Sequence, residues 1–220
     1  MTTKLQNTAI KLAKNFLQFY ISAKQFMQTN KIFCALTFLF VSLRLNFVVL
    51  QDVFVPDELW HTAYMQSSKI KNYEGFGAVF WIFGRIIYFI FSSYYLFVLR
   101  FLALVAIAIS GWYCYKIIQL NKALFNNKKL VSLLLLVFYS SPFFWYTGKI
   151  ITPEFYLFPI IFYAYYEIIL YKGESKKAWL MLGLSVGIKS TAIMATFPIG
   201  IYSFFLLKKD ALLSKANLSR

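Results

Sequence analysis

FGAVFWIFGRIIYFIF, residues 76–91, is the stretch on which the topology of this chain depends. As a helix it extends about 24 Å, whereas the apolar core of a bilayer is roughly 30 Å thick. Arg85 interrupts it near the middle. If the stretch crossed a membrane, the basic segment 116–129 would face outside, against the preference of Lys and Arg for the cytoplasmic side. We therefore predict a helix that lies in the outer interface.

The composition identifies lipid as the solvent of this chain. Its 220 residues are 60% hydrophobic and 21% aromatic, whereas soluble domains are about 45–50% apolar. Apolar runs close to the roughly 20 residues that cross a bilayer as a helix recur along most of the length. The net charge is +15, but the basic residues lie between these runs rather than on one soluble face, so we expect no nucleic-acid partner. The predicted fold is an all-α, polytopic transmembrane protein.

The charges also orient the predicted spans. Residues 32–50 form the first span, with a basic leader before it and an acidic polar stretch, residues 51–75, after it. Since basic segments stay inside, the first span begins in the cytoplasm and the polar stretch lies outside. Further spans are predicted at 95–117, 130–147 and 154–171.

The last apolar stretch, residues 178–207, is too long for one span and is interrupted by Lys189. We predict a kinked or re-entrant helical pair that turns at residues 189–191. The chain then divides into a cytoplasmic amphipathic leader (1–31), a transmembrane domain (32–207) and a cytoplasmic tail (208–220).

Two carboxylates, Asp57 and Glu58, follow Pro56 just beyond the first span. They are compatible with an ordinary helix start, where acidic residues suit the helix dipole. They are equally compatible with a catalytic base, because a carboxylate at the membrane–water boundary is well placed to act on a lipid-borne substrate. His61, the only histidine of the chain, lies beside them as a supporting or merely structural residue.

Other charged residues fall near the predicted outer face. Glu154 and Lys149 belong to a short outer connection, where Glu154 also suits a helix N-terminus. Lys189 lies inside an apolar stretch, so it faces a cavity, pairs with an anion or extends its amine toward water as a structural lysine. Arg85 and Arg100 are further cations near this face, and together these groups suit a lipid phosphate.

The order of these elements resembles the GT-C glycosyltransferases, polytopic enzymes that use polyprenyl- or dolichyl-phosphate sugars. The protein-mannosyltransferase and aminoarabinose-transferase branch is the most similar. The resemblance covers about residues 32–207 and corresponds to the N-terminal portion of such enzymes. The matching motifs are Pro56-Asp57-Glu58, Gly75-Phe76-Gly77, Arg100-Phe101-Leu102, Tyr139-Ser140-Ser141-Pro142, Gly148-Lys149, Pro153-Glu154 and the run from Gly183 to Thr191.

This resemblance implies that the first outer loop forms interfacial helices and that Asp57, with Glu58 beside it, is the catalytic base. It maps the acid of the second outer loop onto Glu154, where the family more often has Asp. Lys149 stands where Arg is common, and Ile188 replaces the Thr that usually precedes the lysine.

The chemistry of sugar transfer assigns roles to the remaining groups. An inverting transfer needs a base for the acceptor hydroxyl and cations for the departing phosphate. Glu154 would position the acceptor or a divalent cation such as Mg²⁺ or Mn²⁺. The donor phosphate would be held by Lys189, Arg100 and Arg85.

The sequence therefore predicts an inverting membrane glycosyltransferase that moves a sugar from a polyprenyl-phosphate donor to an acceptor on the non-cytoplasmic face. The alternatives are a non-catalytic or truncated GT-C-like subunit, and a small transporter, which intramembrane Lys189 and Arg44 favour. Expected partners are the lipid-linked sugar, the bilayer and a further membrane subunit. The abundance of Lys, Asn, Phe and Ile suggests an AT-rich genome and favours the bacterial inner membrane over the endoplasmic reticulum. Both termini are expected in the cytoplasm.

Overall fold

The structure is a computed structural model. It describes residues 14, 17–18, 20–50, 63–64, 66, 77–121, 125–141 and 153–218, with 46–50 and 209–218 in backbone only. Within these ranges all regular structure is helical, which confirms the all-α prediction. The α-helices are α2 (Lys31–Leu50), α4 (Ala78–Phe91), α5 (Tyr95–Leu120), α7 (Lys128–Ser140), α9 (Pro153–Leu170), α10 (Lys176–Ile188) and α11 (Ile193–Leu218), with short 3-10 helices η1 (Ser92–Tyr94) and η2 (Ser190–Ala192).

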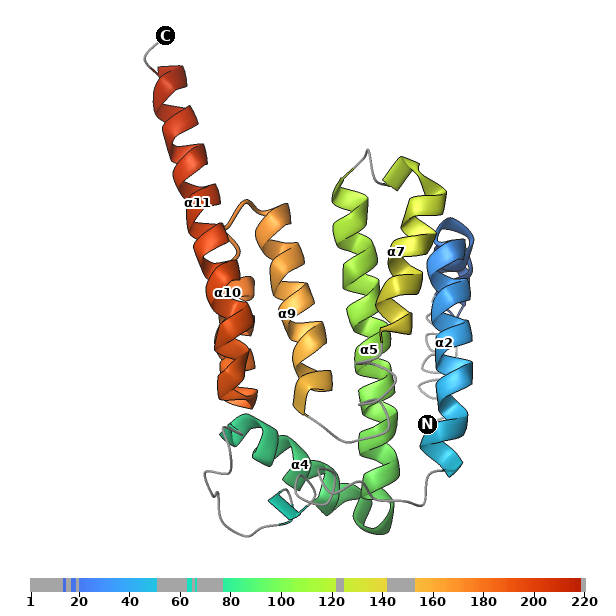
Figure 1. Cartoon of the computed structure of the whole chain (residues 1–220). Helices are drawn as coiled ribbons and strands as arrows, with labels where there is room; N and C mark the ends of the chain where they lie inside the picture. The colour runs from blue at the N-terminus through green and yellow to red at the C-terminus, as the bar shows by residue number, and fades with distance from the viewer. Residues whose placement is uncertain are drawn as a thin grey trace, which may run out of the picture.

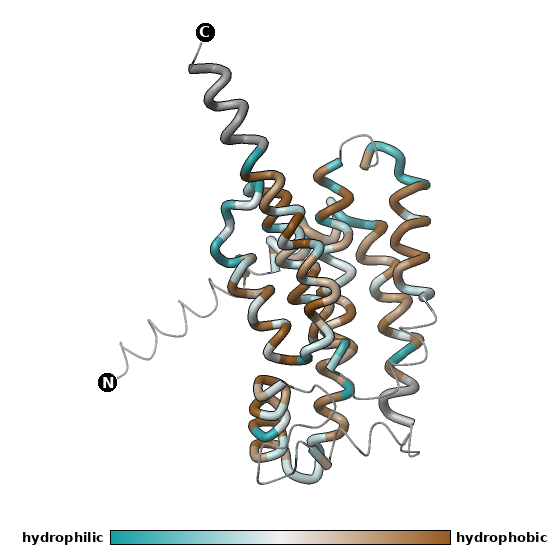
Figure 2. The backbone as a smooth tube through the Cα atoms, turned by 60° about the vertical axis from the view of Figure 1, so that its left-hand side comes forward, coloured by the Kyte–Doolittle hydropathy of each residue, from teal (hydrophilic) through white to brown (hydrophobic). Residues whose placement is uncertain are grey.

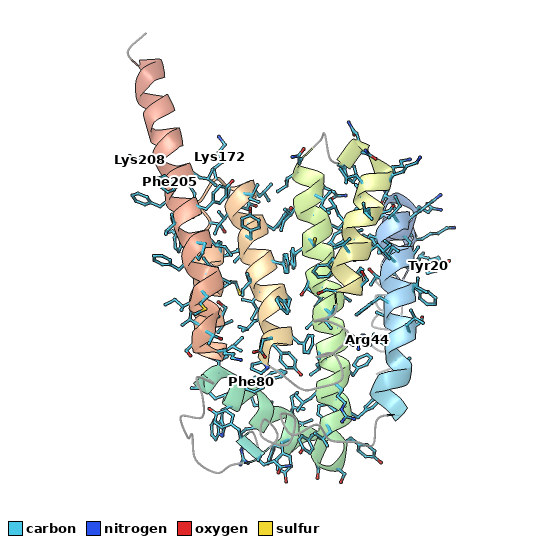
Figure 3. All side chains as sticks on the ribbon, viewed as in Figure 1. Tyr20, Arg44, Phe80, Lys172, Phe205 and Lys208 are labelled. Atoms are coloured by element: carbon cyan, nitrogen blue, oxygen red, sulfur yellow. The ribbon has the colours of Figure 1, made fainter. Side chains whose placement is uncertain are left out.

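Six of these helices run side by side and alternate in direction, whereas α4 lies across one end of the bundle (Figure 1). We call the end where α2, α7 and α10 begin the basic end, because Lys31, Lys128 and Lys176 start these helices or lie in their first turn. The opposite end, where α4 lies, is called the site end. Figure 3 labels Lys172 and Lys208 toward the basic end and Phe80 at the site end.

The crosswise position of α4 agrees with the geometry predicted for residues 76–91. Helical structure is continuous from Ala78 to Leu120, but the chain changes direction at η1, where Ser92 has a φ of 43°. One face of α4 buries Phe80 and Gly84 against the bundle. The opposite face is also apolar and Phe89 is 89% exposed, as expected where that face meets lipid rather than water.

Two helical stretches among the described residues, Ala78–Leu120 and Ser190–Lys208, are long and apolar enough to cross a membrane. A third is added if Tyr20–Thr29 and Lys31–Leu45, which are bent by 101° at Asn30, form one broken span. This bend turns Tyr20–Thr29 away from the axis of α2, and the surface position of the leader stays a prediction. Apolar residues dominate the middle of the helices in Figure 2. The other predicted crossings, and their sidedness, stay predictions.

The bundle has two halves that meet along α5 and α9. In the first, α2, α5 and α7 pack around aromatic residues such as Phe33, Tyr115 and Tyr139. Arg44 is 1% exposed in this half, and its guanidinium lies 5.6 Å from the centroid of the Phe40 ring (Figure 3).

In the second half, α9, α10 and α11 are joined at the basic end by a tight turn. Gly173 adopts a φ of 92° there and donates a hydrogen bond to Ile168 O at 2.9 Å. Only glycine enters this conformation without strain. Ser175 caps α10 and donates a hydrogen bond to Glu167 of α9 at 2.8 Å, so α10 returns directly alongside α9. The last helix, α11, continues through the predicted tail to Leu218.

Single-cysteine labelling tests the predicted sidedness. In a background with Cys34→Ala and Cys114→Ala, a cysteine at exposed Ser93 or Ser190 should react with a membrane-impermeant maleimide added from outside intact cells. A cysteine at exposed Asn121 or Lys177 should react only after permeabilisation. Labelling of Ser93 and Lys177 from the same side would contradict the topology.

Candidate functional site

An apolar cluster at the site end joins four α-helices, α4, α5, α9 and α10, and the short helix η2. Three predicted site residues lie next to members of this cluster in the sequence or one helical turn from them. Leu99 precedes Arg100, Ile188 precedes Lys189, and Leu157 lies about one turn after Glu154. Because buried neighbours hold their backbones in place, the cluster brings these three charged positions to the same end of the bundle (Figure 1). Its buried members are Tyr64, Phe80, Tyr95, Leu99, Leu157, Ile188 and Ala192.

Glu154 and Lys189 form an ion pair at this end. Glu154 lies in the first turn of α9, directly after the buried Pro153. Proline suits the first helical position and a carboxylate suits the positive end of the helix dipole, so the sequence starts α9 here. The side chain of Lys189 is 18% exposed and that of Glu154 is 30% exposed. The pair is therefore partly covered by protein but accessible from the surface.

Lys189 occupies a break between α10 and η2. Its backbone is extended, with φ −151° and ψ 128°. The backbone groups at the break still have partners: Lys189 N donates to Ser185 O at 3.2 Å, and Lys189 O accepts from Ala192 N at 3.0 Å. Ile188 O accepts from Gly77 N at 2.9 Å. Such partners are what allow a helix to break at membrane depth. The predicted turn at residues 189–191 thus begins with a helical break at Lys189.

The last of these hydrogen bonds requires an unusually close approach of two backbones. A Cβ atom on Gly77 would lie 1.7 Å from Gly187 O, which is shorter than any real contact. A Cβ atom on Gly187 would lie 3.0 Å from Val79 Cγ2. The start of α4 therefore packs directly on the end of α10, and glycine is needed at position 77 for this contact.

Arg100 lies in the second turn of α5 and is half-buried. The neighbouring Leu99 O accepts a hydrogen bond from Tyr156 OH at 2.8 Å, so α5 is tied to α9 close to Glu154. This hydrogen bond fixes the position of α5 along the bundle axis relative to the start of α9.

Arg85 is held by the protein itself. Its Nη1 donates to Gln66 O at 2.9 Å, and its guanidinium lies 6.0 Å from the ring centroids of both Trp81 and Tyr88. Gln66 Nε2 in turn donates to Tyr95 OH at 2.7 Å. Arg85 therefore ties Gln66, in the segment before α4, to α4, a role that the sequence did not indicate. Its predicted contact with a donor phosphate stays a prediction.

Four predicted site residues, Asp57, Glu58, His61 and Lys149, lie outside the described residues. The nearest described position is Tyr64, three residues after His61, and it is 2% exposed within the apolar cluster. In the described ranges, no three His, Cys, Asp or Glu side chains lie close enough to hold a metal ion. The predicted divalent cation therefore stays a prediction.

Two features of the site end are not apparent from the sequence. Glu154 and Lys189 are 35 residues apart. The sequence predicted that Glu154 positions the acceptor and that Lys189 binds the donor phosphate, and it did not pair the two residues. The available signal was their charge, because a lysine inside an apolar stretch needs an anion, but Glu154 was only one of several carboxylates predicted on the outer face. The contact of Gly77 with Gly187 carries no comparable signal, since glycine serves many purposes.

Two matched glycine substitutions test the packing of α4 on α10. Gly77→Ala should lower the free energy of unfolding in mixed micelles by at least about 2 kcal/mol, because backbone must move to admit the methyl group. Gly183→Ala, within α10, should leave the free energy of unfolding unchanged or slightly raised, since nothing lies within 4 Å of the added atom. Equal effects of the two substitutions would contradict the close approach.

A double-mutant cycle tests the ion pair. Glu154→Gln and Lys189→Gln should each destabilise the protein, and the double variant should recover about 1–2 kcal/mol of the summed loss, because neither charge is then left alone. The control cycle, Glu174→Gln in the turn before α10 with Lys129→Gln on α7, should show coupling close to zero. A coupling energy at the control level for Glu154 and Lys189 would show that they do not interact.

Comparison of the chain with family models, with curated proteins and with solved structures finds no match. The roles of the site-end residues are therefore argued from this chain alone, and the GT-C resemblance stays a hypothesis.

Proposed function

We propose that this chain is a GT-C-type membrane glycosyltransferase that transfers a sugar from a polyprenyl-phosphate donor to an acceptor hydroxyl on the non-cytoplasmic face. The observation that carries the proposal is the gathering of Glu154, Lys189 and Arg100 at one end of the bundle, around the cluster that also holds Tyr64 of the first outer loop. A carboxylate beside cations at the end of an apolar bundle suits a substrate with a lipid tail and a phosphate.

The reaction assigns each group a step. Asp57 accepts the proton of the acceptor hydroxyl, and the acceptor oxygen then forms a bond to the anomeric carbon of the sugar. The bond between that carbon and the phosphate oxygen breaks, so the lipid phosphate departs with the electron pair. Lys189 and Arg100 stabilise the negative charge that develops on it.

The Glu154–Lys189 pair describes this site before the donor binds. Both side chains are partly exposed, so a phosphate can approach Lys189 from the surface. When a donor phosphate binds Lys189, the carboxylate of Glu154 accepts a hydrogen bond from the acceptor hydroxyl. On this basis Glu154 orients the acceptor only when the donor is present, which couples the binding of the two substrates.

A second candidate is a non-catalytic membrane subunit. The same ion pair favours it, since two charges that neutralise each other at a helix break are also a stable structural element. The two candidates differ in whether Lys189 has a function beyond its contact with Glu154.

Sugar transfer from a panel of radiolabelled polyprenyl-phosphate sugars, in membranes that contain the chain, tests the proposal. Asp57→Asn should lower kcat/KM by at least about 100-fold, the usual contribution of a general base. Lys189→Gln should do the same through loss of phosphate stabilisation. Glu174→Gln and Lys129→Gln, which remove the same charges away from the site end, should transfer at the parent rate.

Membrane insertion of each variant is measured alongside by protease protection. An inserted Asp57→Asn protein that transfers sugar at the parent rate would refute the assignment of the base. If the parent uses no donor while the ion pair shows strong coupling, the non-catalytic subunit is the better account.

A further inference from the structure

A pocket of about 480 Å³ opens at the basic end, on the far side of the bundle from Glu154 and Lys189. Its wall comes from three parts of the fold: the bend at Asn30, the end of α5 and the start of α7. Buried Tyr115 and Val131 contribute apolar surface. This volume lies within the roughly 300–1,000 Å³ that is usual for small-ligand sites.

The polar side chains of the pocket come from two separate segments. Gln28 and Lys31 belong to the bend before and at the start of α2, whereas Asn126 directly precedes the N-cap residue of α7 and Lys128 is the first residue of that helix. The two lysines are thus brought to one cavity although they are far apart in sequence. An apolar floor under a rim with two cations suits an amphiphilic anion better than a fully hydrated ion.

No carboxylate lines this pocket, whereas two lysines do. The sequence contains no Asp or Glu before Asp52 and none between Glu74 and Glu154. The helices α2, α5 and α7 therefore bring no carboxylate of their own to neutralise Lys31 and Lys128. Further lysines flank the pocket, including Lys116, whose Nζ lies 4.7 Å from the centroid of the Trp112 ring. The carboxylates Glu167 and Glu174 also lie at the basic end, but neither lines the pocket, so its two lysines offer their charge to an anion that enters it.

We propose that this pocket binds the phosphate headgroup of an anionic phospholipid of the bilayer leaflet at the basic end. Lys31 and Lys128 hold the phosphate from two sides, Gln28 and Asn126 face the polar part of the headgroup, and the apolar surface of Tyr115 and Val131 accommodates the glycerol end. The bound lipid bridges the leader, α2 and α7. The site is distinct from the proposed catalytic site and independent of it.

Native mass spectrometry of the purified full chain, with phospholipid added in detergent, tests the site. The parent should retain phosphatidylglycerol and should release phosphatidylcholine, whose headgroup carries no net charge. Lys31→Gln/Lys128→Gln should weaken phosphatidylglycerol binding by at least about tenfold, from roughly fivefold for each lysine near an anionic headgroup. Lys31→Arg/Lys128→Arg, which keeps both charges, should bind within about threefold of the parent.

The matched control is Lys129→Gln/Lys177→Gln, which removes two exposed charges from the same end without touching the pocket. It should also bind within about threefold of the parent. Equal loss in the two Gln pairs would overturn the site in favour of diffuse attraction. Retention of phosphatidylcholine as tight as that of phosphatidylglycerol would overturn it as well, as would competition by inorganic phosphate at concentrations equal to those of the lipid. Thermal unfolding confirms that each variant is folded.

Discussion

The hydrogen bond from Gly77 N to Ile188 O is the contact on which the site end depends. A helix that breaks within an apolar hairpin leaves backbone groups that lipid cannot satisfy. Here the break is completed by the start of α4, a segment more than one hundred residues earlier in the chain, and the approach is close enough to require glycine. The same contact therefore stabilises the break, fixes the crosswise position of α4 and presents Lys189 in extended backbone at the surface of the bundle.

From this arrangement follows the electrostatic character of the site. A lysine in an extended segment between two apolar helices is costly unless an anion lies nearby. The start of α9 supplies Glu154, whose own position is set by Pro153 and by the helix dipole. Because both side chains are partly exposed, another ion can reach Lys189 or Glu154 from the surface and replace its partner in the pair.

The sequence was sufficient for the features that depend on pattern. The length of residues 76–91 and the charge of Arg85 predicted a helix that does not continue the bundle, and α4 lies across its end. The interruption of 178–207 at Lys189 predicted the break in the last hairpin, which begins at that residue.

The sequence was insufficient for features that depend on tertiary contact. Nothing in the composition pairs Glu154 with Lys189, because charge sorting assigns residues to a face and not to each other. Arg85 was predicted to hold the donor phosphate, and its contacts with Gln66 and two aromatic rings were not foreseen. Asp57, Glu58, His61 and Lys149 lie outside the described residues, so their placement still rests on the pattern alone.

The attachment of α4 at both of its ends has a mechanical consequence. At its start, the N-cap residue Gly77 donates a hydrogen bond to Ile188 of the hairpin. At its end, α4 is joined to α5 by the three residues of η1. A helix of 14 residues that is held at both ends keeps those ends about 21 Å apart. The spacing between the end of α10 and the first turn of α5 is therefore set by the number of residues in α4. An insertion or deletion of one residue in this helix would rotate its buried face by about 100° and alter that spacing at the same time.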